Sequence, residues 1–182
     1  MQFTLVLDLD ETLVHYQELE EGGGQFLVRP YAELFLETMA KFYEIIIFTA
    51  ALNDYANFIL DIIDVKKSIA HKLYRQHTLT YNGTYIKDLT VIGRDLNKVI
   101  IIDNTVENFQ LQPENGICIQ SWYGDPQDRA LLDLIPILKD VATKKVKNVQ
   151  SALKQFKEKM IKNCLKGIEN PHLNLSLDEE YD

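Results

Sequence analysis

Apolar runs and helix-like stretches alternate along most of the chain. The apolar runs predict strands at residues 3–7, 44–48, 72–74, 99–102 and 116–120, of which the third is the weakest. Two of them, "IIIF" and "VIII", are apolar throughout, which is typical of central parallel strands covered on both faces. Strands that alternate with helices predict an α/β fold, a three-layer doubly wound parallel sheet.

Three stretches between these runs have apolar residues at helical spacing. They are "PYAELFLETMAKF", "LNDYANFILDIID" and "DPQDRALLDLIPILKDVA", and in the last we expect Asp125 to cap a helix that starts at Pro126. Two irregular segments interrupt the pattern. The three glycines from Gly22 predict a loop or short hairpin, and Asn82 followed by Gly83 predicts a tight hairpin turn.

The chain becomes rich in lysine after about residue 142. We therefore divide it into a main domain at 1–142, an amphipathic C-terminal helix at 143–169 and an acidic tail at 170–182 that we expect to be mobile. The helix is expected to lie across the domain. Docking onto a protein partner is the first alternative, and contact with a membrane surface or an acidic partner is the second.

Composition excludes several classes of protein. The net charge of −8 argues against a direct nucleic-acid binder, and no apolar segment reaches the roughly 20 residues of a membrane span. The two cysteines, Cys118 in an apolar run and Cys164, have no ligand spacing, so we expect Cys118 in the core and the protein in a reducing intracellular compartment. With no targeting signal before the first strand, nucleus or cytoplasm is expected, or an organelle if an upstream segment exists.

Polar side chains of related chemistry follow the predicted strands. They are Asp8 and Asp10 after the first strand, Thr49 after the second, Lys87 behind the Asn–Gly hairpin, and Asp103 and Asn104 at the end of the strand that begins at residue 99. The carboxyl ends of parallel strands meet at one edge of a sheet, so we expect these groups to converge. A pair of close carboxylates also requires a positive partner.

Phosphoryl transfer from a monoester fits this set of groups. Asp8 would attack phosphorus and form an aspartyl-phosphate, while Asp10 would act first as general acid and then as general base. Thr49 and Lys87 would hold the phosphoryl oxygens. Mg²⁺ would bind Asp8, Asn104 and the backbone carbonyl of Asp10, and it would be the positive partner of the acids.

Neighbouring residues have supporting roles in this hypothesis. Asp103 would position the lysine or a metal-bound water. We expect Thr12 to secure the turn that presents both aspartates and assign it to the substrate-binding residues. Glu11 is expected to point elsewhere.

The stretch "DLDETLVH" resembles the signature of the haloacid dehalogenase superfamily, in the branch of the RNA polymerase II CTD phosphatases. The resemblance continues through "RPYAELFLETM", "FTAALNDYA", "LYRQHTLTYNGTYIKDL", "GRDLNKVIIIDNT" and "SWYGDPQDRALLDLIPIL", so it covers about residues 3–156. It implies an uncapped, Mg²⁺-dependent phosphatase whose substrate is a phosphoserine or phosphothreonine protein.

The same resemblance assigns residues one by one. It implies Asp8 as nucleophile, Asp10 as acid and base, Thr49 and Lys87 as phosphate-binding groups, and Asn104 as a metal ligand. It also places a peptide groove at Leu52, Tyr55 and Arg75. The sequence departs from the small CTD phosphatases at one place. They have a longer insertion that forms a pocket for a proline beside the phosphoserine, whereas this chain has only "YQELEEGGGQFLV" there, so we expect a truncated pocket and an altered specificity.

Three other functions compete with this one. A response-regulator receiver gathers similar groups, but its phosphorylated aspartate lies on a later strand than its acid pair. A phosphatase fold kept as a binding or assembly subunit is the main rival, as in the mitochondrial import receptor that shares this domain. A small-molecule phosphatase comes third.

Overall fold

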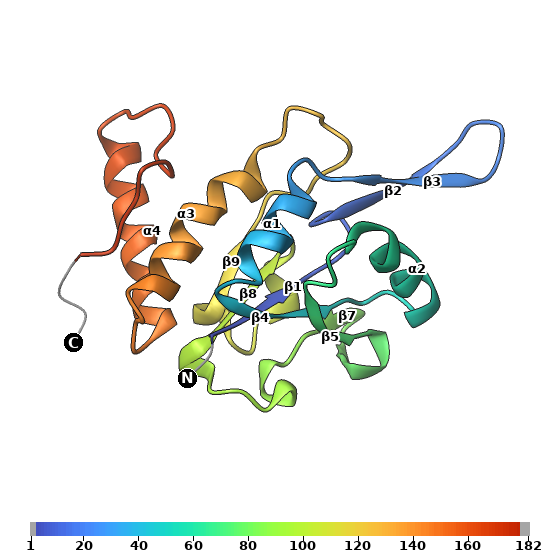
Figure 1. Cartoon of the computed structure of the whole chain (residues 1–182), viewed down its shortest axis with the longest axis horizontal. Helices are drawn as coiled ribbons and strands as arrows, with labels where there is room; N and C mark the ends of the chain where they lie inside the picture. Colours follow the sequence, from blue (N-terminus) through green and yellow to red (C-terminus); the bar gives the residue numbers. More distant parts are fainter. Residues whose placement is uncertain (1–2, 179–182) are drawn as a thin grey trace.

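A five-stranded parallel sheet forms the centre of the molecule in the computed structural model, which describes residues 3–178. The strand order is β5-β4-β1-β8-β9. The bounds are Phe3–Leu7 for β1, Tyr43–Phe48 for β4, Ile69–Leu73 for β5, Val99–Asp103 for β8 and Gly116–Cys118 for β9. The chain thus runs from β1 outward to β4 and β5, then returns to β8 on the other side of β1 (Figure 1). In α/β sheets this reversal marks the usual position of a ligand.

The two faces of the sheet are covered differently. Buried side chains of α1 (Ala32–Met39), α2 (Asn53–Ile63), α3 (Ala130–Thr143) and α4 (Val149–Leu165) share one core cluster with Leu5 and Leu7 of β1. Val6 points to the opposite cluster, which is closed by Leu89 and Phe109 from short 3₁₀ helices. The predicted α/β fold with a parallel sheet is confirmed, with one outer layer made of 3₁₀ turns.

Two hairpins extend from this body. β2 (Val14–Glu18) pairs with β3 (Gly24–Val28), and the pair projects from the right-hand side of the molecule in Figure 1. β6 (Leu79–Tyr81) pairs with β7 (Thr84–Ile86). Asn82 and Gly83 connect them with φ values of 47° and 77°, the left-handed backbone that a tight hairpin turn of this kind needs. Both predicted hairpins are therefore present.

The third predicted helix begins later than expected. α3 starts at Ala130, and the carboxylate of Asp125 accepts a hydrogen bond from the backbone N–H of Gln127 in a turn instead of capping the helix. The reason is a distant contact. Asp128 is held by two 2.8 Å hydrogen bonds from the buried guanidinium of Arg29, and it also accepts from the N–H of Ala130.

The C-terminal part packs onto the same core. Residues 143–169, expected to be one helix, are the end of α3, a turn at 144–148 and α4. The tail from residue 170, which we expect to be mobile, contacts the domain through Leu177. Leu177 is only 3% exposed, its N–H donates to the carboxylate of Asp140 at 2.6 Å, and its carbonyl accepts from Lys144 at 2.6 Å. Residues 179–182 lie outside the described part.

Two smaller expectations concern the surface. Cys118 is exposed at the end of the edge strand β9, so its expected place in the core is wrong. Within residues 3–178, no helix combines the length and the apolar character that crossing a membrane requires.

Candidate active site

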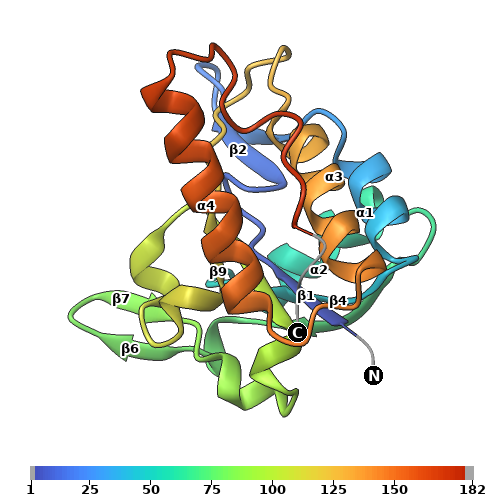
Figure 2. The same cartoon turned by 90° about the vertical axis from the view of Figure 1, so that its left-hand side faces the viewer.

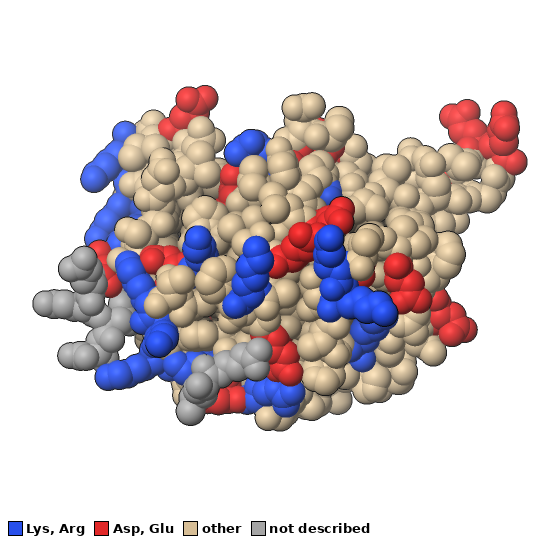
Figure 3. Space-filling view, in the orientation of Figure 1, with Lys and Arg blue, Asp and Glu red and all other residues tan. Residues whose placement is uncertain are grey.

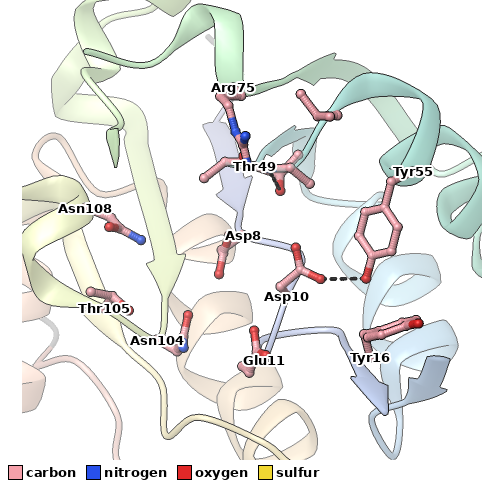
Figure 4. Close-up of a pocket in the computed structure, with 13 residues that line it drawn as sticks. Asp8, Asp10, Glu11, Tyr16, Thr49, Tyr55, Arg75, Asn104, Thr105 and Asn108 are labelled. Atoms are coloured by element: carbon pink, nitrogen blue, oxygen red, sulfur yellow. Dashed lines mark hydrogen bonds between the residues drawn. The ribbon is translucent and has the colours of Figure 1, made fainter. Parts of the chain in front are cut away.

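A cavity of about 720 Å³ lies at the carboxyl ends of β1, β4 and β8 (Figure 4). Seven of the predicted site residues line it: Asp8, Asp10, Thr49, Leu52, Tyr55, Arg75 and Asn104. They come from three strand ends, the start of α2 and the turn before β6. The parallel sheet therefore brings together side chains that are almost 100 positions apart in sequence.

A buried lysine lies behind the first aspartate. The ammonium of Lys87 is 2.6 Å from Asp8 Oδ1 and 2.5 Å from Asp103 Oδ2, and neither Lys87 nor Asp103 is exposed at all. The other oxygen of Asp8 accepts a hydrogen bond from the Thr12 hydroxyl at 3.1 Å. Asp103 also accepts from the side chain of Asn108 at 3.1 Å. The Asp8 carboxylate is thus fixed in orientation from two sides.

The charges of this group shift each other's ionisation. The pKa of Asp8 is raised to about 6, because burial and the carboxylate of Asp103 raise it by more than the nearby ammonium of Lys87 lowers it. Burial alone would lower the pKa of Lys87, but the two carboxylates outweigh burial and raise it. The two carboxylates therefore favour the charged form of Lys87, and Asp8 loses its proton at about pH 6.

Asp10 occupies a different environment on the same side of the cavity. Its carboxylate accepts a 2.9 Å hydrogen bond from the hydroxyl of Tyr55, drawn as a dashed line in Figure 4. Burial raises the pKa of Asp10, and the Tyr55 hydrogen bond opposes that rise. Two carboxylates one residue apart thus have different partners, which is the arrangement that separates a nucleophile from a general acid.

Oxygen atoms suited to a hard divalent cation face the cavity. The amide nitrogen of Asn104 donates to the hydroxyl of Ser121 at 2.9 Å, so the amide oxygen points toward Asp8 in Figure 4. Among residues 3–178, no group of three or more His, Cys, Asp or Glu side chains is arranged to hold a metal. Two aspartates and one amide fit Mg²⁺, which binds few protein oxygens and keeps several waters.

Thr49 and Arg75 line the part of the cavity that is uppermost in Figure 4. Thr49 follows the end of β4 and is almost fully buried. Its hydroxyl oxygen accepts a hydrogen bond from the N–H of Ala51 at 3.0 Å, and this contact fixes the orientation of the hydroxyl. Arg75 donates to the carbonyl of Ala50 at 2.6 Å and lies over the ring of Tyr85 at 4.8 Å. The guanidinium is therefore held in place at the rim.

Some predictions about individual residues are not met. Thr12 is fully buried and does not line the cavity, so its assignment to the substrate-binding residues stays a prediction, while its contact with Asp8 agrees with a role in the turn. Lys87 and Asp103 lie behind Asp8 and not on the cavity wall. Glu11 was expected to point elsewhere but lines the cavity, 3.3 Å from the ring of His15.

The cavity also contains residues that sequence reasoning missed. Tyr16 comes from β2, and Thr105 and Asn108 come from the segment after β8. Asn108 stands four residues after Asn104 in "DNTVENF", and that spacing was the available signal. The sequence contains no signal for Ser121, because its role is to orient Asn104 through a contact across the sheet edge.

Comparison with known proteins gives a consistent result. The family model described as NLI interacting factor-like phosphatase matches residues 3–150. The chain is 44% identical over 158 residues to CTD small phosphatase-like protein 3 of Caenorhabditis elegans, covering 78% of this chain and 55% of that protein. It is 40% identical over 154 residues to the mitochondrial import inner membrane translocase subunit tim50 of Aspergillus fumigatus, covering 85% of this chain and 31% of that protein.

Solved structures agree on the fold. The structure of Fcp1, an essential RNA polymerase II CTD phosphatase, matches with a TM-score of 0.64 at 16% identity, covering 92% of this chain and 67% of that one. The 3-deoxy-D-manno-octulosonate 8-phosphate phosphatase of Moraxella catarrhalis, solved with magnesium and phosphate, matches with a TM-score of 0.54 at 12% identity, covering 79% and 88%. The chain spans only about half of the length of the Caenorhabditis elegans relative and about a third of the length of the Aspergillus fumigatus relative.

Proposed function

The chain belongs to the NLI interacting factor-like phosphatase family, and from that premise we propose that it is a Mg²⁺-dependent phosphatase of phosphoserine and phosphothreonine in proteins. One observation carries the proposal. Asp8 and Asp10 open into the same cavity, and Asp8 alone is backed by the buried ammonium of Lys87. This arrangement supports a nucleophile that is ionised near neutrality beside a carboxyl group that can hold a proton.

In the first step, an oxygen of Asp8 attacks phosphorus and the bond from phosphorus to the serine or threonine oxygen breaks. Asp10 donates its proton to the departing oxygen, so the alcohol leaves neutral. The phosphoryl group then remains on Asp8 as an aspartyl-phosphate. Tyr55 holds Asp10 in place through their 2.9 Å hydrogen bond.

In the second step, water attacks the aspartyl-phosphate and Asp10 takes its proton, which releases phosphate and restores Asp8. Lys87 and the Thr49 hydroxyl stabilise the charge of the phosphoryl group as the bonds change. Asp8, Asn104 and the backbone carbonyl of Asp10 would hold Mg²⁺, which offsets the negative charge of the phosphate and the carboxylates. Asp103 keeps Lys87 charged and in position.

The shape of the site supports a protein substrate. The rim consists of the exposed Leu52, Tyr55 and the fixed guanidinium of Arg75, and these side chains suit an extended phosphopeptide. The β2–β3 hairpin is short, with five residues in each strand. We therefore propose weak discrimination for a proline beside the phosphoserine, and a strong proline preference in a phosphopeptide panel would contradict this.

Two free cysteines in residues 3–178 support a reducing intracellular compartment.

Hydrolysis of an aryl phosphate tests the activity. We expect turnover with Mg²⁺, none with a chelator and none with Asp8→Asn, while Asp61→Asn on the exposed face of α2 serves as the matched control. Well-folded protein without chelator-sensitive turnover would contradict the proposal.

The second candidate is a phosphatase fold that serves in an assembly. The 40% identity to a translocase subunit favours it, because that identity is close to the identity with proteins named phosphatases. The same assay separates the two, since an assembly subunit needs none of the acid pair. In that case Asp8→Asn would leave the capture of a partner unchanged and there would be no turnover to lose.

A further inference from the structure

The outward face of α4 combines lysines with exposed apolar side chains. Lys154, Lys157, Ile161 and Leu165 stand three or four residues apart, so they form one row along the helix, here called the α4 ridge. In Figure 2 the helix runs along the outside of the molecule and faces the viewer. Ile161 is 46% exposed and Leu165 is 83% exposed.

The apolar part of the ridge takes no part in the core. Val149, Ala152 and Phe156 on the opposite face of α4 provide the buried contacts with the domain. Among the exposed large apolar side chains of residues 3–178, Leu165 has the highest exposed fraction. Apolar side chains that are exposed together on one helix face and take no part in the core are a candidate contact surface.

The charge of this segment differs from that of the whole chain. Residues 149–169 contain five lysines and two glutamates, whereas the whole chain has a net charge of −8. The side chains of Lys154, Lys157 and Lys166 make no ion pair with any residue between 3 and 178. In Figure 3, lysines mark the left edge over α4 and glutamates mark the tip of the β2–β3 hairpin at the other end. Asp178, which pairs with Lys159 at 2.7 Å, opposes this charge locally, and Glu158 and Glu169 are the two carboxylates of the segment itself.

We propose that the α4 ridge docks the domain on an anionic lipid surface. Ile161 and Leu165 would enter the boundary between head groups and acyl chains, and the lysines beside them would contact the anionic head groups. The ridge lies on the outside of the molecule (Figure 2), and no α4 residue lines the active-site cavity or the cavity between α3 and residues 172–175. Exposed apolar side chains beside lysines on an outer helix suit a deformable anionic surface, whereas an acidic protein would need a groove that matches the helix.

The position of the ridge keeps the catalytic cavity accessible. The cavity lies between β1, α2 and β2, and α4 is at the opposite end of the view in Figure 1. A domain that docks through α4 would therefore present its active site away from the lipid. The proposal depends on no catalytic residue, so its outcome is independent of the proposed phosphatase activity.

Vesicle co-sedimentation tests the proposal. The full chain is mixed with phosphatidylcholine vesicles, with vesicles that also contain phosphatidylserine, and separately with poly-glutamate as an acidic protein-like probe. We expect binding to the phosphatidylserine vesicles alone, weakened by salt. Lys154→Gln with Lys157→Gln is expected to weaken binding on the order of 30-fold, and Leu165→Ser at least about tenfold.

Matched controls remove the same groups elsewhere. Lys41→Gln with Lys66→Gln makes the same charge change, and Val65→Ser removes a 65% exposed apolar side chain at the end of α2. These variants are expected to bind like the unchanged protein. No binding to phosphatidylserine vesicles, binding to poly-glutamate alone, or vesicle binding that survives Leu165→Ser would overturn the proposal.

Discussion

Replacing Lys87 with methionine tests the centre of the site most severely. The ammonium lies 2.6 Å and 2.5 Å from two carboxylates, both inaccessible or nearly so. At an effective dielectric constant of about 20, each attraction amounts to about 6 kcal/mol before desolvation is counted. Desolvation offsets much of it, and loss of one partner from a buried ion pair lowers the free energy of unfolding by about 3–5 kcal/mol.

The same change affects catalysis through a different route. Without the ammonium, Asp8 and Asp103 repel each other, the pKa of Asp8 rises further, and the phosphoryl group on Asp8 loses the cation next to it. Loss of one such stabilising group lowers kcat by about 10²–10³-fold. We therefore expect Lys87→Met to show both a lower denaturation midpoint and this loss of kcat on an aryl phosphate with saturating Mg²⁺.

A double variant separates stability from catalysis. Lys87→Met with Asp103→Asn removes the uncompensated charge of Asp103 and keeps an oxygen acceptor for the N–H of Thr105. We expect it to recover about half of the lost stability and none of the lost kcat. Recovery of kcat to the original level would refute the reasoning, because Lys87 would then only neutralise Asp103. An unchanged denaturation midpoint in the single variant would refute the stability argument.

Three further outcomes follow from the site and its support. Because burial raises the pKa of Asp8 to about 6, the rate measured at low Mg²⁺ should fall about tenfold per pH unit as the pH drops below that value; a flat profile to about pH 4 would contradict this. Ser121→Ala frees the amide of Asn104 to rotate, so the Mg²⁺ concentration for half-maximal rate should rise about fivefold with kcat at saturation unchanged; an unchanged Mg²⁺ titration would argue against Asn104 as a ligand. Arg29→Met leaves Asp128 without its two hydrogen bonds and should lower the free energy of unfolding by about 3 kcal/mol, measured by urea titration; a change within error would mean that this ion pair is not stabilising.

Local patterns were sufficient for most of the sheet and for the convergence of the site. The first strand ends at Leu7 as its apolar run indicates, and the Asn82–Gly83 turn has the backbone that its residues favour. Since the sheet is parallel, the residues after its strands meet at one edge, and this geometric rule located Asp8, Thr49 and Asn104 in one cavity.

Contacts between distant residues explain what the patterns missed. The start of α3 depends on Asp128 pairing with Arg29, 99 positions away, and the packing of the tail depends on Leu177 reaching Asp140. Glu11 faces the cavity because its backbone is left-handed, with φ of 57°, so the alternation of a strand does not extend to it. Neither the distant contacts nor the left-handed backbone of Glu11 leaves a periodic signal in the sequence.

In the proposed mechanism Asp8 carries the phosphoryl group during turnover. This role is tested most directly by acid-quenching the protein with Mg²⁺ and a ³²P-labelled phosphoserine peptide, then locating the protein-bound label by proteolysis. We expect label on the peptide that contains Asp8, none with chelator and none with Asp8→Asn. Label on another residue, or turnover in Asp8→Asn equal to that of the unchanged protein, would contradict it.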